Sequence, residues 1–189
     1  VEIAKMVFHK FDPELKVDVF INDGARVKKG DIAFEVTGKV QSLLQTERLM
    51  LNIMQRMSGI ATTTHKYMEQ LKGLKTKVLD TRKTTPGMRI LEKEAVKIGG
   101  GYNHRIGLFD MILLKDNHVD FAGGIVNAIT KARKYLAEKG KEMKIEIEVR
   151  NLDELQQVLN TGGVDRIMLD NFSPELTKKA VELIGGRFE

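Results

Sequence analysis

The chain has 189 residues, 42% hydrophobic and 30% charged, so it can bury a core as one large domain or two small ones. It has no cysteine, which excludes disulfides, cysteine nucleophiles and thiolate metal sites. It also lacks an apolar run of about 18 residues and a signal-peptide core, so we expect a soluble cytoplasmic protein without a membrane span.

The formal net charge is +5, which suits either nucleic acid or a small polyanion as partner. Lysines and arginines are interleaved with acids, recur at loop starts and form no long basic run. Only 6% of the residues are aromatic. This distribution favours a pocket for an anion over a basic stripe for nucleic acid, which stays as an alternative.

Residues 1–38 are predicted to form a small α/β unit. Residues 1–11 have helical spacing of apolar positions, and Asp12-Pro13 ends that helix. Two strands are expected at 17–21 and 32–36, with a turn at Asp23-Gly24. The wording of 23–36 is also similar to half of a lipoyl carrier domain, although no carrier lysine stands at a hairpin tip. A mass shift on a lysine would reveal that alternative.

Residues 39–70 are predicted to be helical, with a break at Ser58-Gly59 and an end before Gly73. After residue 75, four apolar runs alternate with helical patterns, which is typical of parallel βα units. The predicted strands are 77–80, 111–114, 145–149 and 166–169. Ligands of α/β barrels bind where such strands end, and each run ends in ionisable residues.

The first run ends in Arg82 and Lys83, followed by two threonines and Pro86-Gly87. Adjacent cations repel each other, so an anionic ligand explains them better than packing does. The alternative is a solvated loop with two surface cations.

Glu146 and Glu148 are predicted to share one face of the third strand. Strands of parallel sheets are normally buried on both faces, so these carboxylates require solvent, cationic partners or a metal. An exposed edge strand is the alternative.

Gly99-Gly100-Gly101 precedes His104 and Arg105 and suggests a loop whose backbone approaches something closely, such as an anion. A flexible loop is the alternative. A zinc site is disfavoured because His104 and His118 lack metal-ligand spacing.

Several segments together resemble the quinolinate phosphoribosyltransferase family (nicotinate-nucleotide pyrophosphorylase, carboxylating). They are Glu47-Arg48 ahead of LNIMQRMSGIAT, then DTRKTTPGMR, EKEAVKIGGGYNHRIGLFDMILLKDNH, IEIEVRNLDEL and IMLDN. They occur in the family's order over most of residues 20–185. The resemblance implies transfer of phosphoribose from phosphoribosyl pyrophosphate to quinolinate, with loss of carbon dioxide and formation of nicotinate mononucleotide for NAD synthesis.

By this resemblance, Arg82, His104 and Arg105 would grip the quinolinate carboxylates. Lys83 and Lys115 would bind substrate and donor and act in catalysis. Such a cationic site suits a dicarboxylate, since arginine binds carboxylates bidentately.

The resemblance also implies that Glu148 and Asp170 are catalytic acids near the ribose and ligands of magnesium, directly or through water. Asp116 would be a further member of this group. Arg48 would reach the active site of a neighbouring subunit, which implies a homo-oligomer, either a dimer or an assembly of dimers. Asp80 has no assigned role beyond orienting Arg82.

The fold class implied is an α/β protein, with an incomplete parallel α/β barrel like that of type II phosphoribosyltransferases. Residues 1–64 would be part of an N-terminal α/β sandwich domain with a long helix, and 65–189 the incomplete barrel. Four strands are too few for a full barrel, so we expect the chain to be a piece of a longer protein. By itself, this chain is expected to have weak turnover and an exposed sheet edge. A relative acting on nicotinate without decarboxylation is the nearest alternative function.

Overall fold

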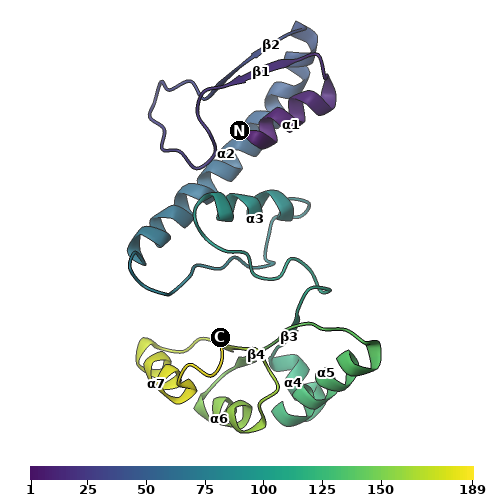
Figure 1. Ribbon diagram of the computed structural model, residues 1–189, viewed down its shortest axis with the longest axis vertical. Coiled ribbons are helices and arrows are strands. Elements are labelled where there is room, and N and C mark those ends of the chain that lie inside the picture. The colour runs from purple at the N-terminus through teal and green to yellow at the C-terminus, as the bar shows by residue number, and fades with distance from the viewer. The chain divides into compact units, whose positions relative to one another are not determined.

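We describe residues 1–189 of the chain from a computed structural model (Figure 1). The chain divides into two units, Val1–Ile106 and Gly107–Glu189, each with its own internal packing. The boundary predicted after residue 64 lies inside α2 (Val40–Gln70) and stays a prediction. None of the helices combines the length and the hydrophobicity that a membrane span requires. The cytoplasmic location stays a prediction.

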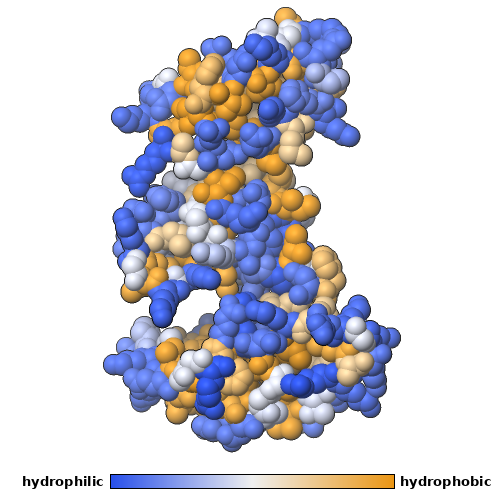
Figure 2. Space-filling model, in the orientation of Figure 1, coloured by the Kyte–Doolittle hydropathy of each residue, from blue (hydrophilic) through white to orange (hydrophobic).

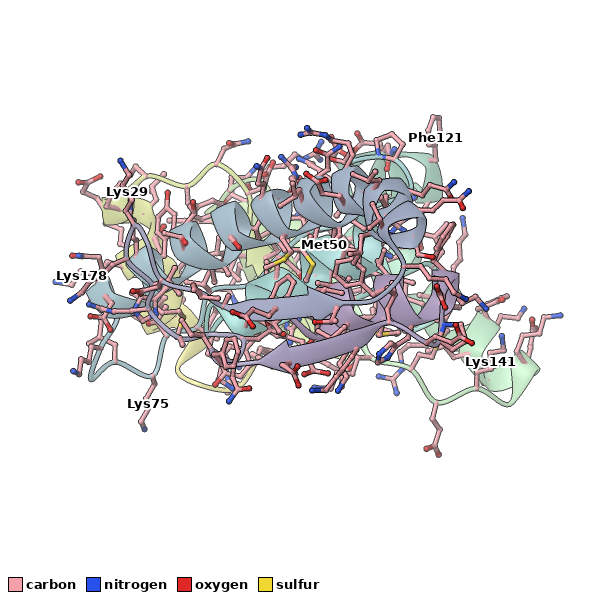
Figure 3. All side chains as sticks on the ribbon, turned by 90° about the horizontal axis from the view of Figure 1, so that it is seen from above. Lys29, Met50, Lys75, Phe121, Lys141 and Lys178 are labelled. Carbon is pink, nitrogen blue, oxygen red and sulfur yellow. The ribbon has the colours of Figure 1, made fainter.

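The first unit begins with α1 (Glu2–Phe11) and an antiparallel hairpin of β1 (Lys16–Val19) and β2 (Phe34–Thr37). Their apolar side chains meet α2 in one small core. Figure 3 shows Met50 of α2 lying over the hairpin, where it packs with Phe8 and Leu15. The predicted helix–strand–strand–helix order is confirmed.

The hairpin also exposes large apolar side chains. Phe20, Val27 and Ile32 each have more than half of their surface in solvent, at 58%, 61% and 58%. Hydrophobic colour gathers around the hairpin in Figure 2, whereas the rest of the visible surface is mixed. All three residues lie in the segment that connects β1 to β2.

The α2 helix runs without interruption for 31 residues, so the predicted break at Ser58-Gly59 is wrong. Glycine in a helix costs only about 0.5–1 kcal/mol relative to alanine, which tertiary packing easily offsets. The Thr63 hydroxyl also donates to the Gly59 carbonyl at 2.9 Å, one turn along the helix.

The predicted strand at 77–80 is reduced to a single parallel bridge between Leu79 and Tyr102. The Tyr102 N–H donates to the Val78 carbonyl at 2.9 Å, and the Asp80 N–H donates to the Tyr102 carbonyl at 3.1 Å. Only two apolar residues precede Asp80, and Leu79 is 43% exposed, so the run lacks the buried faces of a central strand. The expectation that this run forms one of the strands of the parallel sheet is therefore wrong.

The glycine run after α3 (Arg89–Ile98) explains how this helix packs against α2. A Cβ atom on Gly99 would lie 2.4 Å from the Ala61 carbonyl oxygen, and one on Gly101 would lie 2.7 Å from Thr64 Cγ2. The close backbone approach predicted for the glycines is therefore an approach to α2.

The second unit contains a parallel sheet with the order β3 (Ile112–Leu114), β4 (Ile145–Val149) and β5 (Arg166–Leu169). Between and after these strands come four helices, which lie against one side of the sheet (Figure 1). They are α4 (Asp116–Ala122), α5 (Ile125–Lys139), α6 (Leu152–Thr161) and α7 (Pro174–Ile184). This is the βα alternation expected of part of a barrel.

The core of the second unit lies between this sheet and its helices. Ile147 and Val149 of β4 are fully buried and pack with Leu155 and Val158 of α6. Side-chain caps begin α6 and α7. The Asn151 side chain accepts from the Glu154 N–H, and Ser173 accepts from Leu176 ahead of Pro174.

Candidate active site

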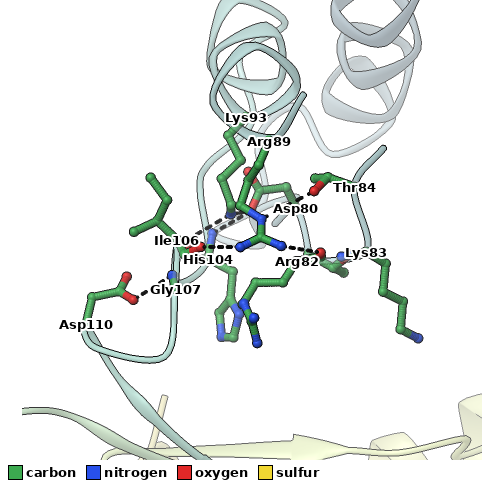
Figure 4. A network of polar contacts seen from close by, with 11 residues as sticks. Asp80, Arg82, Lys83, Thr84, Arg89, Lys93, His104, Ile106, Gly107 and Asp110 are labelled. Atoms are coloured by element: carbon green, nitrogen blue, oxygen red, sulfur yellow. Dashed lines mark hydrogen bonds and ion pairs between the residues drawn. The ribbon is translucent and has the colours of Figure 1, made fainter. Parts of the chain in front are cut away.

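Two cation-bearing loops of the first unit leave the same backbone bridge. The bridge joins Leu79 to Tyr102, so the loop with Arg82 and the loop with His104 begin beside each other. In Figure 4 the side chains of Arg82 and His104 point the same way, away from α3. The structure thus brings together two residues that are 22 positions apart in the sequence.

The guanidinium of Arg82 carries an unused donor. Its Nε is buried and makes no hydrogen bond within the chain. Lys83 is exposed, and its backbone N–H donates to the Thr81 hydroxyl at 3.1 Å. A buried donor without a partner is costly, and an anionic ligand would supply the acceptor.

The α3 helix holds both loops from one side. Arg89 donates to the Arg82 carbonyl at 3.3 Å, to the Thr84 hydroxyl at 3.3 Å and to the Ile106 carbonyl at 3.2 Å. One turn later, Lys93 pairs with Asp80. These contacts were missed in the sequence, although Arg89 and Lys93 have the spacing of one helix face.

Glu92, on the same face, is 7% exposed and accepts from Arg56 of α2 at 2.8 and 2.9 Å and from the Thr85 N–H at 3.2 Å. Burial opposes ionisation of Glu92, but the hydrogen bonds from Thr85 and Arg56 outweigh it and lower the pKa of this carboxyl group. Glu92 therefore ties the TTPG turn to both helices.

The hydrogen-bond partners of Asp80 lie on α3 and on the His104 loop. Its carboxylate accepts from Lys93, from the His104 N–H at 2.9 Å and from the Asn103 side-chain amide at 2.7 Å. Asp80 thus belongs with the His104 loop.

The predicted residues of the second unit lie where its three strands end. Lys115 follows β3, Glu148 lies near the end of β4, and Asp170 follows β5. Lys115 Nζ is 3.1 Å from Glu148 Oε1. The Asp170 N–H donates to the Val149 carbonyl at 3.0 Å, which continues the ladder beyond β5.

Both glutamates of β4 have cationic partners. Glu146 is fully buried and lies 3.2 Å from Arg166 Nη1, and Glu148 pairs with Lys115. β4 is the central strand, so the edge-strand alternative is wrong. This charged face is opposite the apolar face on which the helices pack.

Two neighbouring polar residues have local roles. His118 Nδ1 accepts from the Lys115 N–H at 3.0 Å and caps α4. Asp116 is exposed at the first turn of α4 and accepts from the Asn117 N–H. Its place in the site stays a prediction.

Arg48 is exposed on α2 and makes no ion pair within the chain. Leu44 and Val40, one and two turns earlier on the same helix face, are also exposed, at 67% and 69%. The predicted residues therefore divide between the units. Arg48, Arg82, Lys83, His104 and Arg105 belong to the first, and Lys115, Glu148 and Asp170 to the second.

The chain has no group of three or more histidine, cysteine, aspartate or glutamate side chains placed to hold a metal. Glu148 and Asp170 nevertheless end adjacent strands. Mg²⁺ is commonly bound by one or two carboxylates together with substrate phosphates and water. The donor set therefore fits magnesium that arrives with a phosphorylated substrate.

Comparison with known proteins gives matches over the whole chain. A family model described as the N-terminal domain of quinolinate phosphoribosyl transferase matches residues 1–58, and one described as the C-terminal domain matches 60–189. A nicotinate-nucleotide pyrophosphorylase (carboxylating) of Arabidopsis thaliana is 47% identical over 203 aligned positions, covering 100% of this chain and 58% of that protein. A probable nicotinate-nucleotide pyrophosphorylase (carboxylating) of Bacillus subtilis is 41% identical, covering 96% and 61%.

Solved structures agree. NadC from Streptococcus pyogenes has a TM-score of 0.91 and 43% identity, covering 100% of this chain and 66% of that one. The nicotinate-nucleotide pyrophosphorylase of Francisella tularensis has a TM-score of 0.89 and 44% identity, covering 98% and 64%. The predicted fold class is confirmed, and the chain spans 58% of the length of the Arabidopsis relative. The resemblance seen in the sequence is confirmed too: the chain belongs to the quinolinate phosphoribosyltransferase family.

Proposed function

We propose that the protein containing this chain transfers phosphoribose from phosphoribosyl pyrophosphate to quinolinate and decarboxylates the product to nicotinate mononucleotide. The single observation that carries this proposal is the pair of loops with Arg82 and His104, including a buried guanidinium donor that an anion would satisfy. The names of the relatives point to the same reaction.

The first unit is proposed to bind quinolinate. Arg82, His104 and Arg105 offer donors on two neighbouring loops, which suits a ligand with two carboxylates. Lys83 extends the positive surface from the same loop as Arg82. In this role each carboxylate replaces the water around a cation with fixed hydrogen bonds.

The second unit is proposed to bind the ribose and the departing pyrophosphate. Lys115 would shift from Glu148 toward donor oxygens, and Glu148 would then face the positive charge that develops on the ribose. Glu148 and Asp170 would hold magnesium, whose role when bound is to neutralise charge on the pyrophosphate.

The proposed bond changes need no covalent enzyme intermediate. The bond between ribose C1 and pyrophosphate breaks, and pyrophosphate takes the electron pair. The pyridine nitrogen then forms the new bond to C1 and becomes a cation. The carboxylate beside it leaves as carbon dioxide, the pyridinium stabilises the electron pair left on the ring, and a proton replaces the lost group.

The direct test is carbon dioxide release by the full-length protein that contains this chain, with quinolinate and phosphoribosyl pyrophosphate supplied together. We expect labelled carbon dioxide from quinolinate carrying the label in the carboxylate beside the nitrogen, and none without the donor. Turnover of nicotinate without carbon dioxide release would instead establish the alternative transferase and refute this proposal.

We also propose that the full-length protein is a homo-oligomer in which Arg48 completes a neighbouring active site. The exposed stripe of Val40, Leu44 and Arg48 on α2 supports this, since apolar side chains beside an unpaired cation are typical of a subunit interface. Mixing inactive Arg48→Ala and Lys115→Ala subunits tests it. Full exchange in a dimer should restore about one quarter of wild-type activity, because half of the dimers then contain one intact site. No restoration would refute action of Arg48 across subunits.

A further inference from the structure

A buried ion pair lies beneath the His104 loop. Lys93 of α3 and Asp80 bind each other with side-chain exposures of only 3% and 8%. Neither residue has a role in the proposed reaction. Lysine and aspartate are rarely buried to this extent unless they are paired, as these two are.

Both members of the pair also bind the main chain of His104. The Asp80 carboxylate accepts from the His104 N–H at 2.9 Å, and the Lys93 ammonium donates to the His104 carbonyl at 3.2 Å (Figure 4). One residue supplies an acceptor and the other a donor, so together they fix the peptide groups on both sides of one Cα atom.

The Asn103 side-chain amide reinforces this arrangement. It donates to the second Asp80 oxygen at 2.7 Å and to the Lys93 carbonyl at 2.9 Å. The carboxylate of Asp80 is thereby held by three different donors. The backbone entering His104 has little freedom to rotate.

Stability alone does not account for such a pair. Removing two charges from water costs several kcal/mol, and buried ion pairs can often be replaced by apolar residues without loss of stability. An apolar pair, however, offers no acceptor for the His104 N–H and no donor for its carbonyl. The benefit specific to these two side chains is the fixed direction of the loop.

We infer that Asp80 and Lys93 are positioning residues that fix the His104 backbone and thereby aim the side chains of His104 and Arg105 at the dicarboxylate substrate. This inference rests on the proposed function. It assigns a purpose to a buried pair that does not itself touch the substrate.

The test compares Lys93→Met with Lys97→Met in the full-length protein. Lys97 lies on the same helix and pairs with Glu94 on the surface, so its loss controls for removing a lysine from α3. We expect Lys93→Met to weaken quinolinate binding at least about tenfold in calorimetry, with the KM for quinolinate rising in parallel. The affinity of Lys93→Met for phosphoribosyl pyrophosphate should stay within about twofold of the wild-type affinity. Lys97→Met should change the affinity for neither ligand.

A second variant separates positioning from folding. Lys93→Met leaves the Asp80 charge buried without its partner, so Asp80→Asn with Lys93→Met should recover thermal stability. Quinolinate affinity should stay weak in this double variant, because the donor to the His104 carbonyl is still missing. A loss of stability alone would lower the active fraction without changing the affinity of the folded molecules.

The inference is overturned if the folded single or double variant binds quinolinate as tightly as Lys97→Met does. It is also overturned if both ligands weaken equally. If the unmodified protein neither binds quinolinate nor releases carbon dioxide from it, the proposed function itself fails, and that result is distinct because it needs no variant.

Discussion

Two glycine-to-alanine substitutions in the first unit are expected to change stability in opposite directions. Gly99→Ala places a Cβ atom 2.4 Å from the Ala61 carbonyl oxygen and 2.7 Å from Thr64 Cβ. Carbon atoms attract best at about 3.5–4.0 Å, so both contacts are strongly repulsive. The obstacle is the backbone of α2, which cannot rotate away as a flexible side chain would.

Gly59→Ala is the matched control. A Cβ atom at Gly59 would meet nothing within 4 Å, and the residue lies inside α2. Gly99 has φ −74° and ψ 0°, which alanine also adopts, so backbone strain does not separate the two sites. Both substitutions reduce the freedom of the unfolded chain equally, and only the native surroundings differ.

Overpacking of this kind costs about 1–3 kcal/mol, and a backbone obstacle favours the upper half of that range for Gly99→Ala. Gly59→Ala should gain about 0.5–1 kcal/mol from helix propensity. A chain of this size shifts by about 2–4 °C in Tm per kcal/mol, so the two variants should melt on opposite sides of the wild type. Urea unfolding followed by circular dichroism measures both. Equal stability of the two variants would refute the packing of α3 on α2 through its glycines.

Other changes have expected outcomes of their own. Arg105→Ala should abolish quinolinate binding in calorimetry while leaving donor binding partly intact. Arg166→Ala removes a cationic partner of the fully buried Glu146 carboxylate and should cost about 3–5 kcal/mol in urea unfolding. The pKa of Glu92 is lowered in the folded state, so its contribution to stability is present above the ordinary value of 4.5 and is lost as the pH falls through the lowered one. Glu92→Gln should therefore flatten the decline of unfolding free energy in acid.

Each of these outcomes has a contrary result. Unchanged quinolinate affinity in Arg105→Ala would show that Arg105 does not bind the quinolinate carboxylates. Lys144→Ala, which breaks an exposed pair, should cost no more than about 1 kcal/mol, and an equal cost for Arg166→Ala would show that the buried pair is not special. An acid decline of the same steepness in Glu92→Gln would mean that Glu92 does not carry the pH dependence.

Local chemistry made much of the chain predictable. Asn151 and Ser173 begin helices because a side-chain oxygen next to free N–H groups has one good arrangement, which depends only on neighbouring residues. The sequence also indicated the importance of the cationic residues that follow Asp80 and Gly101. Adjacent positive charges at the end of an apolar run repel each other, so their presence there predicts an anion close to them.

The parts that failed depend on distant contacts. From the sequence alone, Gly59 indicates a break in the helix, and only the structure shows that α2 continues through it. Val78-Leu79 likewise indicates a strand, and only the structure shows that its pairing is limited to one bridge with Tyr102. The polar face of α3 was missed because Arg89 and Lys93 look like ordinary surface charges. Only their partners, the Arg82 and His104 backbones, show that this face is turned inward.

The clamp on the main chain of His104 has a consequence for how substrate preference can change. Asp80 and Lys93 bind the N–H and the carbonyl of His104, so neither of these two hydrogen bonds involves the side chain at position 104. A new side chain at position 104 or 105 would leave both of these main-chain hydrogen bonds in place. Single substitutions at these two positions would therefore change which acidic ring is bound, while Asp80 and Lys93 keep their contacts with the backbone.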